Sequence, residues 1–210
     1  MRNRAENQIT LALIRHGATK ANEEHRYLGK TDEALSERGR RELLTYKARG
    51  RYPKADAVFV SPMKRCVETA GILYPSISPV YVPEWREMDF GEFEYKNFEE
   101  LNGDARYQAW IDSGGALAFP GGESREDFVS RCKKGLVKLC KRSPAQAAAV
   151  VHGGTIMALL YAFGGMEYYK GQVSNGGGYL CTLTWLGAMD AQTGNSRMAD
   201  SIQIRAEAKL

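Results

Sequence analysis

The segment "AAAVVHGGTIMALLYAFGG", residues 147–165, identifies the fold better than any other part of the sequence. Residues 147–151 form a short apolar run of the length typical of a buried β-strand. A glycine pair at 153–154 follows as a turn. Residues 155–163 are apolar on every side, which indicates a buried helix that ends at a second glycine pair. The segment therefore predicts a strand, a turn and a helix, which is the repeating unit of α/β proteins.

The same order occurs twice nearer the N-terminus. The run "ITLALI" (9–14) predicts a buried strand, and "ADAVFVSP" (55–62) predicts another. Ser61 followed by Pro62 is typical of a helix start, with serine as the N-cap and proline in the first helical position. We therefore expect a strand that leads directly into a helix here.

The second half of the chain continues the alternation. Ser124, with Asp127 three residues later, predicts a capped helix whose apolar residues recur at helical spacing. Two late strands are expected within 176–187 and 201–206, the second near a sheet edge. Together these elements predict an α/β fold: a three-layer sandwich with a mostly parallel central sheet and helices on both faces.

Residues 91–122 interrupt this rhythm with a segment rich in aromatic and charged residues. We interpret it as a lid insertion and expect residues 1–210 to form a single domain, because the length suits one core. Its aromatic residues Tyr95, Tyr107 and Trp110 are expected to pack the lid, with a role as a platform for substrate as the alternative.

Composition limits the function classes. The net charge of +4 favours small anionic ligands and is too weak and scattered for nucleic acid. No segment reaches the length of a membrane span, and the N-terminus has no apolar run fit for a signal peptide, so a cytoplasmic location is expected. The four cysteines lack the C-x-x-C spacing of a zinc site and are expected to be free buried thiols.

Polar residues follow three of the predicted strands. Arg15 and His16 end the first, Ser61 ends the second with Arg65 in the helix after it, and His152 ends the third. Ligands of α/β sheets gather where strands end, so these side chains are expected to meet. Two arginines, two histidines and the glycines at a helix start predict a pocket for an anion such as phosphate.

This set of residues resembles the histidine phosphatase superfamily, the phosphoglycerate mutase-like proteins. The resemblance runs from about residue 10 to residue 185 and consists of five blocks in family order. An asparagine at position 22 also falls where the first signature usually carries one. The blocks are "RHGAT" (15–19), "YLGKTDEALSERG" (27–39), "SPMKRCVETA" (61–70), "EWREMDFGEFE" (84–94) and "VVHGGT" (150–155).

The resemblance implies a mechanism and assigns roles. His16 would attack phosphorus through one ring nitrogen while the other donates to a backbone carbonyl. Arg15, Arg65 and His152 would hold the phosphate oxygens. Glu87 would donate a proton to the leaving oxygen and then activate water, with Asp89 or Glu92 as the alternative acid. No metal or other cofactor is expected. Further phosphate-binding groups would be Gly17, Asn22 and Gly153.

Within the superfamily, the sequence is most similar to the α-ribazole phosphatase branch, which acts in cobalamin biosynthesis. One departure is Tyr95, which stands where glycine is commoner and brings the lid geometry into question. The expected partner is a small phosphorylated metabolite, and a homodimer is left open. The alternatives are a broad-specificity phosphatase, a phosphoglycerate mutase and a non-catalytic sensor of a phosphorylated ligand. His25 is expected at the surface, and Arg26 either at the pocket mouth or facing water.

Overall fold

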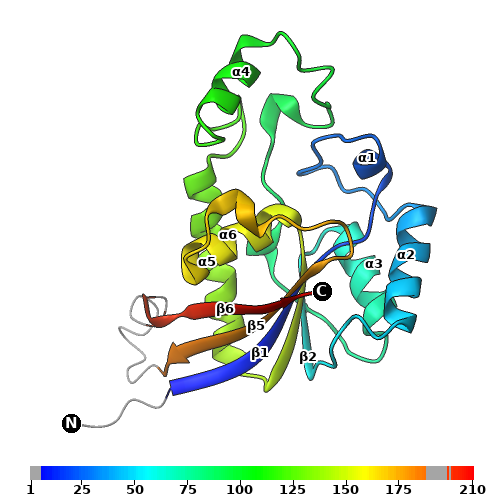
Figure 1. The fold of residues 1–210 in the computed structure, drawn as a ribbon, viewed down its shortest axis with the longest axis vertical. Coiled ribbons are helices and arrows are strands. Elements are labelled where there is room, and N and C mark those ends of the chain that lie inside the picture. Colours follow the sequence, from blue (N-terminus) through cyan, green and yellow to red (C-terminus); the bar gives the residue numbers. More distant parts are fainter. Residues whose placement is uncertain (1–5, 188–197, 199) are drawn as a thin grey trace.

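The computed structural model describes residues 6–187, 198 and 200–210, and in these ranges the chain forms one six-stranded sheet (Figure 1). The strand order is β3-β2-β4-β1-β5-β6. The pairs β3–β2, β2–β4 and β4–β1 are parallel, whereas β5 runs antiparallel to both β1 and β6. The mostly parallel sheet is therefore confirmed. The strands are β1 (Glu6–Arg15), β2 (Ala57–Val60), β3 (Val80–Tyr81), β4 (Gln146–Val151), β5 (Gly178–Leu186) and β6 (Gln203–Lys209).

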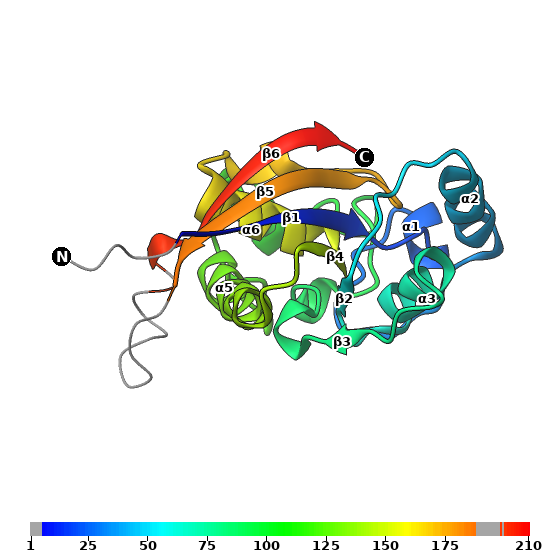
Figure 2. The same ribbon diagram turned by 90° about the horizontal axis from the view of Figure 1, so that it is seen from below.

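Helices cover both faces of this sheet, as Figure 2 shows. Successive residues of β1 point to opposite faces. Leu11 and Leu13 pack in a core with α5 and α6, whereas Ala12 and Ile14 pack in a second core with α2 and α3. None of the helices in the described ranges is long and apolar enough to cross a membrane. The helices are α1 (Lys20–Glu23), α2 (Glu37–Ala48), α3 (Lys64–Leu73), α4 (Ala105–Asp112), α5 (Arg125–Arg142) and α6 (Gly153–Gly164).

One predicted helix start is wrong. The helix after β2 begins at Lys64, and its N-cap is Met63, which makes no side-chain capping bond. Ser61 does not cap this helix, because its hydroxyl is hydrogen-bonded to the ring of His152. The predicted cap at Ser124 is confirmed, since the backbone N–H of Asp127 donates to its hydroxyl at 3.1 Å. A serine after a strand can thus bond to a residue at a neighbouring strand end instead of capping the helix that follows it.

The lid segment, residues 91–122, contains a 3₁₀ turn (Gly91–Phe93) and α4, and in Figure 1 it stands apart from the sheet beyond α1 and α6. Two of the three expected aromatic residues pack in its interior: Tyr107 stacks on Trp110 with ring centroids 6.1 Å apart, and Phe119 lies 4.9 Å from Trp110. The expectation is wrong for Tyr95, whose side chain is exposed. The lid therefore has a small apolar core of its own.

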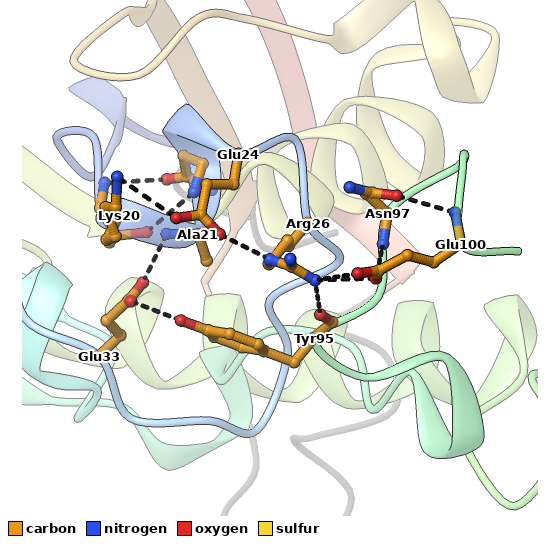
Figure 3. A network of polar contacts seen from close by, with 10 residues as sticks. Lys20, Ala21, Glu24, Arg26, Glu33, Tyr95, Asn97 and Glu100 are labelled. Atoms are coloured by element: carbon orange, nitrogen blue, oxygen red, sulfur yellow. Dashed lines mark hydrogen bonds and ion pairs between the residues drawn. The ribbon is translucent and has the colours of Figure 1, made fainter.

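A polar network attaches the lid to the loop that follows α1 (Figure 3). Arg26 donates to the carbonyl of Tyr95 at 2.8 Å and forms ion pairs with Glu24 and Glu100. The hydroxyl of Tyr95 donates to Glu33 at 3.1 Å, and Glu33 accepts from the backbone N–H of Ala21 in α1. Of the two positions expected for Arg26, the pocket mouth is the one observed, because Arg26 lines the cavity, and its guanidinium also joins two segments of chain.

Candidate active site

The central feature of the site is the meeting of two strand ends. Parallel pairing places Arg15 opposite Val151, so the residues that follow β1 and β4 emerge side by side. His16 follows the first strand and His152 the second, and their ring centroids are 5.2 Å apart in an edge-on arrangement. The predicted convergence of these strand ends is what the structure shows.

His16 is oriented by a bond to its own neighbour. The ring is 3% exposed, and Nδ1 lies 2.7 Å from the carbonyl oxygen of Gly17. A carbonyl can only accept, so Nδ1 carries the hydrogen and Nε2 keeps a free lone pair. Burial and the charges of Arg65 and Arg15 hold the pKa of His16 well below its ordinary value. The ring is therefore neutral and suited to act as a nucleophile.

Gly17 lies behind this ring and does not line the cavity. Its backbone N–H donates to Thr69 at 3.1 Å, and a Cβ at this position would overlap the side chain of Leu43. The close approach of α2 and α3 to the strand end explains why glycine is needed here. Its amide is occupied, so a phosphate-binding role for Gly17 has no support in this geometry.

Arg15 provides an unpaired donor at the cavity floor. One terminal nitrogen donates to the carbonyl of Val173 at 2.7 Å. The Nε atom is buried and has no hydrogen-bond partner within the described part of the chain. A buried charged donor without an acceptor is costly unless a ligand completes it, and a phosphate oxygen is a suitable acceptor.

Glu87 contributes a carboxyl group to the same cavity. Its oxygens accept from the backbone N–H groups of Met88 at 2.9 Å and Gly154 at 3.3 Å. A Cβ on Gly154 would overlap Oε1, so the glycine is what allows this close approach. Burial raises the pKa of Glu87 despite these bonds and the nearby arginines. A carboxyl group that keeps its proton to higher pH is suited to act as a general acid.

The two alternative acids do not reach the cavity. Asp89 pairs with Lys30 at 3.2 Å and accepts from the backbone N–H of Gly91. Glu92 pairs with Arg106 at 2.7 Å on the exposed side of the lid. Neither carboxylate lines the wall that contains His16, whereas Glu87 does.

Arg65 and His152 lie next to His16 but beneath the cavity floor. Arg65 donates from Nε to Nδ1 of His152 at 3.2 Å, and its terminal nitrogens donate to the carbonyls of Gly29 and Thr31. Because Nδ1 of His152 accepts, its Nε2 carries the hydrogen and donates to the Ser61 hydroxyl at 2.8 Å. Both side chains are fully buried. Their role as phosphate ligands stays a prediction. In this structure, Arg65 and Ser61 hold the His152 ring in place, and the guanidinium of Arg65 puts a positive charge behind His16.

Asn22 and Gly153 do line the cavity. Asn22 closes the capping box of α1 with Thr19, and its Oδ1 accepts from Nδ2 of Asn175 at 2.9 Å. Asn175 also donates to the backbone carbonyl of His16, at 3.2 Å. Sequence reasoning missed Asn175, although the run of glycines after it marks a loop that leads into the site. Gly153 begins α6, whose N-terminal dipole favours an anion.

The cavity has a volume of about 650 Å³ and two kinds of wall. Its floor is polar and cationic, and its remaining walls are aromatic. His25 lines it although its side chain is exposed, so this histidine lies at the mouth as well as at the surface. Within the described ranges, no three His, Cys, Asp or Glu side chains are grouped as metal ligands. The aromatic lining residues are Tyr27, Phe90, Phe98, Trp110, Phe119, Tyr168 and Tyr169.

Comparison with known proteins agrees with this geometry. The family model of the histidine phosphatase superfamily (branch 1) matches residues 11–200. The chain is 31% identical over 161 residues to the uncharacterized phosphatase PhoE of Bacillus subtilis, covering 74% of this chain and 77% of that protein. It is 29% identical over 158 residues to the adenosylcobalamin/alpha-ribazole phosphatase of Salmonella typhimurium, covering 73% and 78%.

A solved structure shows the same fold. The alpha-ribazole phosphatase of Shigella flexneri superposes with a TM-score of 0.72 at 23% identity, covering 94% of this chain and 95% of that one. The family model spans most of the sequence and includes every strand end that forms the cavity floor. The chain is therefore a member of the histidine phosphatase superfamily, branch 1.

Proposed function

We propose that this protein hydrolyses phosphomonoesters through a phosphohistidine formed on His16. The observation that carries the proposal is the neutral His16 ring, held with Nε2 free in a cavity that also contains the protonatable Glu87. Phosphatase relatives in the same superfamily support the reaction class.

The first step transfers the phosphoryl group to the enzyme. Nε2 of His16 forms a bond to phosphorus while the ester P–O bond breaks, and protonated Glu87 gives its proton to the departing oxygen. The charge of Arg15 stabilises the oxygens of the transferring group, and the dipole of α6 adds to it. The ring remains aligned because its Nδ1–H stays bonded to Gly17.

The second step returns the enzyme to its starting state. Glu87, now ionised, takes a proton from water as the water oxygen attacks phosphorus. The P–N bond breaks, inorganic phosphate leaves, and Glu87 is again protonated. The contacts of Glu87 with the amides of Met88 and Gly154 stabilise the ionised form between the two steps.

For the physiological substrate we propose α-ribazole phosphate. Support comes from the relatives named for that activity and from the aromatic walls, which suit an alcohol part that carries a flat ring. A broad-specificity phosphatase is the second candidate, because the chain is also similar to PhoE. A phosphoglycerate mutase fits less well, since neither lid cation, Lys96 or Arg106, lines the cavity, and Arg106 is paired with Asp104 and Glu92.

A panel of phosphomonoesters tests both levels of the proposal. Phosphate release from p-nitrophenyl phosphate tests the reaction class, and no turnover from mildly acidic to neutral pH would favour a phosphate-binding sensor instead. The specificity constant for α-ribazole phosphate should exceed those for 3-phosphoglycerate and sugar phosphates. Comparable specificity constants across the panel would contradict α-ribazole phosphate as the physiological substrate, but they would not contradict the reaction class.

A further inference from the structure

We propose that Arg125, Tyr168 and Tyr169 form a subsite for a second anionic group, carried on the alcohol part of the phosphomonoester. We call these three residues the distal wall. The inference rests on the proposed function, because it concerns the part of the substrate that leaves when the phosphate is removed. It makes the preferred substrate class a phosphomonoester with a separate carboxylate or phosphate. The alcohol part of α-ribazole phosphate carries no such group, so evidence for the subsite would count against that substrate and leave the proposed reaction class unchanged.

Arg125 is a cation without an anionic partner among the described residues. It lines the catalytic cavity, and its one hydrogen bond to the described residues is a long contact of 3.4 Å with the carbonyl of Gly114. No carboxylate of residues 6–187, 198 or 200–210 lies within ion-pair distance of it. It is also the first residue of α5, where the helix dipole disfavours a positive charge. Neither an ion pair nor helix stability explains an arginine at this position.

The remaining cations of the cavity are already committed. Arg15 lies at the floor, where its guanidinium is part of the proposed phosphate site. Arg26 pairs with Glu24 and Glu100 and holds the lid. Arg125 is therefore the cation of the described walls that remains available to a second anion.

Besides the hydroxyl of Tyr169, a further neutral donor lies beside the distal wall. Gly115 of the lid has φ +71°, and a Cβ there would overlap the Tyr169 hydroxyl and approach the Trp110 ring at 3.2 Å. The indole Nε1 of Trp110 is buried and has no acceptor in the described part of the chain. An anionic oxygen on the catalytic side of the wall would accept from the Arg125 guanidinium and the Tyr169 hydroxyl.

A second cavity defines which side of the wall the anion would occupy. This side cavity, of about 390 Å³, shares Arg125, Tyr168 and Tyr169 with the catalytic one. Glu167 and Lys170 line the side cavity only, and their opposite charges offset each other there, whereas Trp110 lines the catalytic cavity and not the side cavity. The guanidinium lies over the Tyr168 ring at 5.3 Å, which restricts its movement. The subsite is thus assigned to the catalytic side of the distal wall.

A series of aryl phosphates tests the proposal. Phenyl phosphate is compared with esters that bear a para carboxylate on a linker of zero to three methylene groups. We expect at least one carboxylate ester to have a kcat/KM about tenfold above phenyl phosphate, the scale of a charge-assisted hydrogen bond. Arg125→Gln should abolish that preference and Tyr169→Phe should reduce it. No preference in the wild type, or one that survives in Arg125→Gln, would overturn the subsite.

The control and a binding measurement separate this inference from the proposed function. Lys141→Gln removes the same charge from the other end of α5, where the residue lines a different cavity, and should keep the preference. Calorimetry with the matching benzylphosphonates, which cannot be hydrolysed, measures the subsite without turnover. An Arg125-dependent affinity for the carboxylate phosphonates without hydrolysis of any ester would refute the phosphatase and support the subsite. Hydrolysis of the esters without that affinity would support the phosphatase and refute the subsite.

Discussion

The floor and the lid of the cavity are held in place by different forces. His16 is 3% exposed and His152 is fully buried, and both follow strands at the centre of the sheet. The lid is attached through ion pairs near the surface, such as Arg26 with Glu100, whose side chain is 46% exposed. Buried hydrogen-bonded groups are costly to displace, whereas exposed ion pairs contribute about 1 kcal/mol or less.

This difference separates chemistry from specificity. The floor positions the groups that would break the P–O bond, and its rigidity comes from the sheet. The lid and the loop after α1 supply most of the aromatic wall, and they can change without disturbing the floor. Substitutions in the floor should therefore reduce turnover of every substrate, and substitutions in the lid should act on KM and on some substrates only.

Removal of the nucleophile should have the largest effect. His16→Ala should lower kcat at least about 10⁴-fold, because no other group can form the covalent intermediate. It should also abolish acid-labile labelling of the protein by a radioactive phosphomonoester. The matched variant His25→Ala, which changes the histidine at the cavity mouth, should retain the label. A label that persists on His16→Ala would show that the nucleophile is misassigned.

Removal of the general acid Glu87 should have the second-largest effect on kcat. Glu87→Gln should lower kcat by about 10² to 10⁴-fold for an alkyl phosphate, whose leaving oxygen needs a proton. The loss in phosphoryl transfer should be smaller for p-nitrophenyl phosphate, because nitrophenolate leaves without one. Rapid-quench measurement of enzyme phosphorylation compares the two esters in that single step. Equal losses for both would argue that Glu87 acts only by holding the N-terminus of α6.

The pH profile reports on the same two groups. The first step needs neutral His16 and protonated Glu87. Burial lowers the pKa of His16, so kcat/KM should fall only when the pH drops below that lowered pKa. Burial raises the pKa of Glu87, so kcat/KM for alkyl phosphates should fall as the pH rises through that raised pKa. In Glu87→Gln the alkaline limb should disappear, and an unchanged limb would assign it to another group.

An indirect change to the floor should have a moderate effect. Gly154→Ala places a Cβ where Oε1 of Glu87 lies, so the carboxyl group must move. A displacement of this kind can lower kcat by up to about 10²-fold. Gly71→Ala is a suitable control, because a Cβ there meets no atom within 4 Å. Thermal unfolding of both variants checks that the fold is intact, and full activity of Gly154→Ala would contradict the close contact.

The same division explains what could be predicted from the sequence. The strand ends with Arg15, His16 and His152 were predictable, because the apolar runs show where each strand ends. The alternation of strands and helices then indicates a parallel sheet, in which such ends lie at one edge. The individual bonds were not predictable. The local pattern predicts Ser61 as a helix cap, yet its hydroxyl bonds to His152, a residue 91 positions away along the chain. Whether a hydroxyl bonds to its own helix or to a distant ring depends on tertiary packing, which no local pattern contains.

The lid was the least predictable part, and Tyr95 shows why. Its backbone has φ +64°, a left-handed conformation that glycine adopts without strain. The tyrosine therefore keeps the backbone expected of the commoner glycine and adds contacts to Glu33 and Arg26. Tyrosine rarely adopts a positive φ, so the residue type alone predicts a different backbone at this position. The observed angle depends on contacts with segments far away in the sequence, which the sequence pattern does not reveal.

The smallest expected effect is on stability, and it tests how the contacts and the backbone strain of Tyr95 contribute to holding the lid. Tyr95→Gly removes the contacts with Glu33 and Arg26 but relieves the backbone strain, so the free energy of unfolding should change by less than about 1 kcal/mol. Tyr95→Ala loses the same contacts and keeps the strain, and it should be less stable than Tyr95→Gly by about 1 kcal/mol. Chemical denaturation measures both.

Kinetics of these two variants then separate the lid from the floor. Because Glu33 also holds α1, which carries Asn22 at the cavity wall, loss of the tyrosine should loosen substrate binding. We expect KM for aryl phosphates to rise about threefold, equivalent to well under 1 kcal/mol of binding, while kcat stays near that of the wild type. Tyr95→Phe, which loses only the bond to Glu33, should lie between. A fall in kcat with KM unchanged would mean that the lid and the floor are coupled, and the separation of chemistry from specificity would then be wrong.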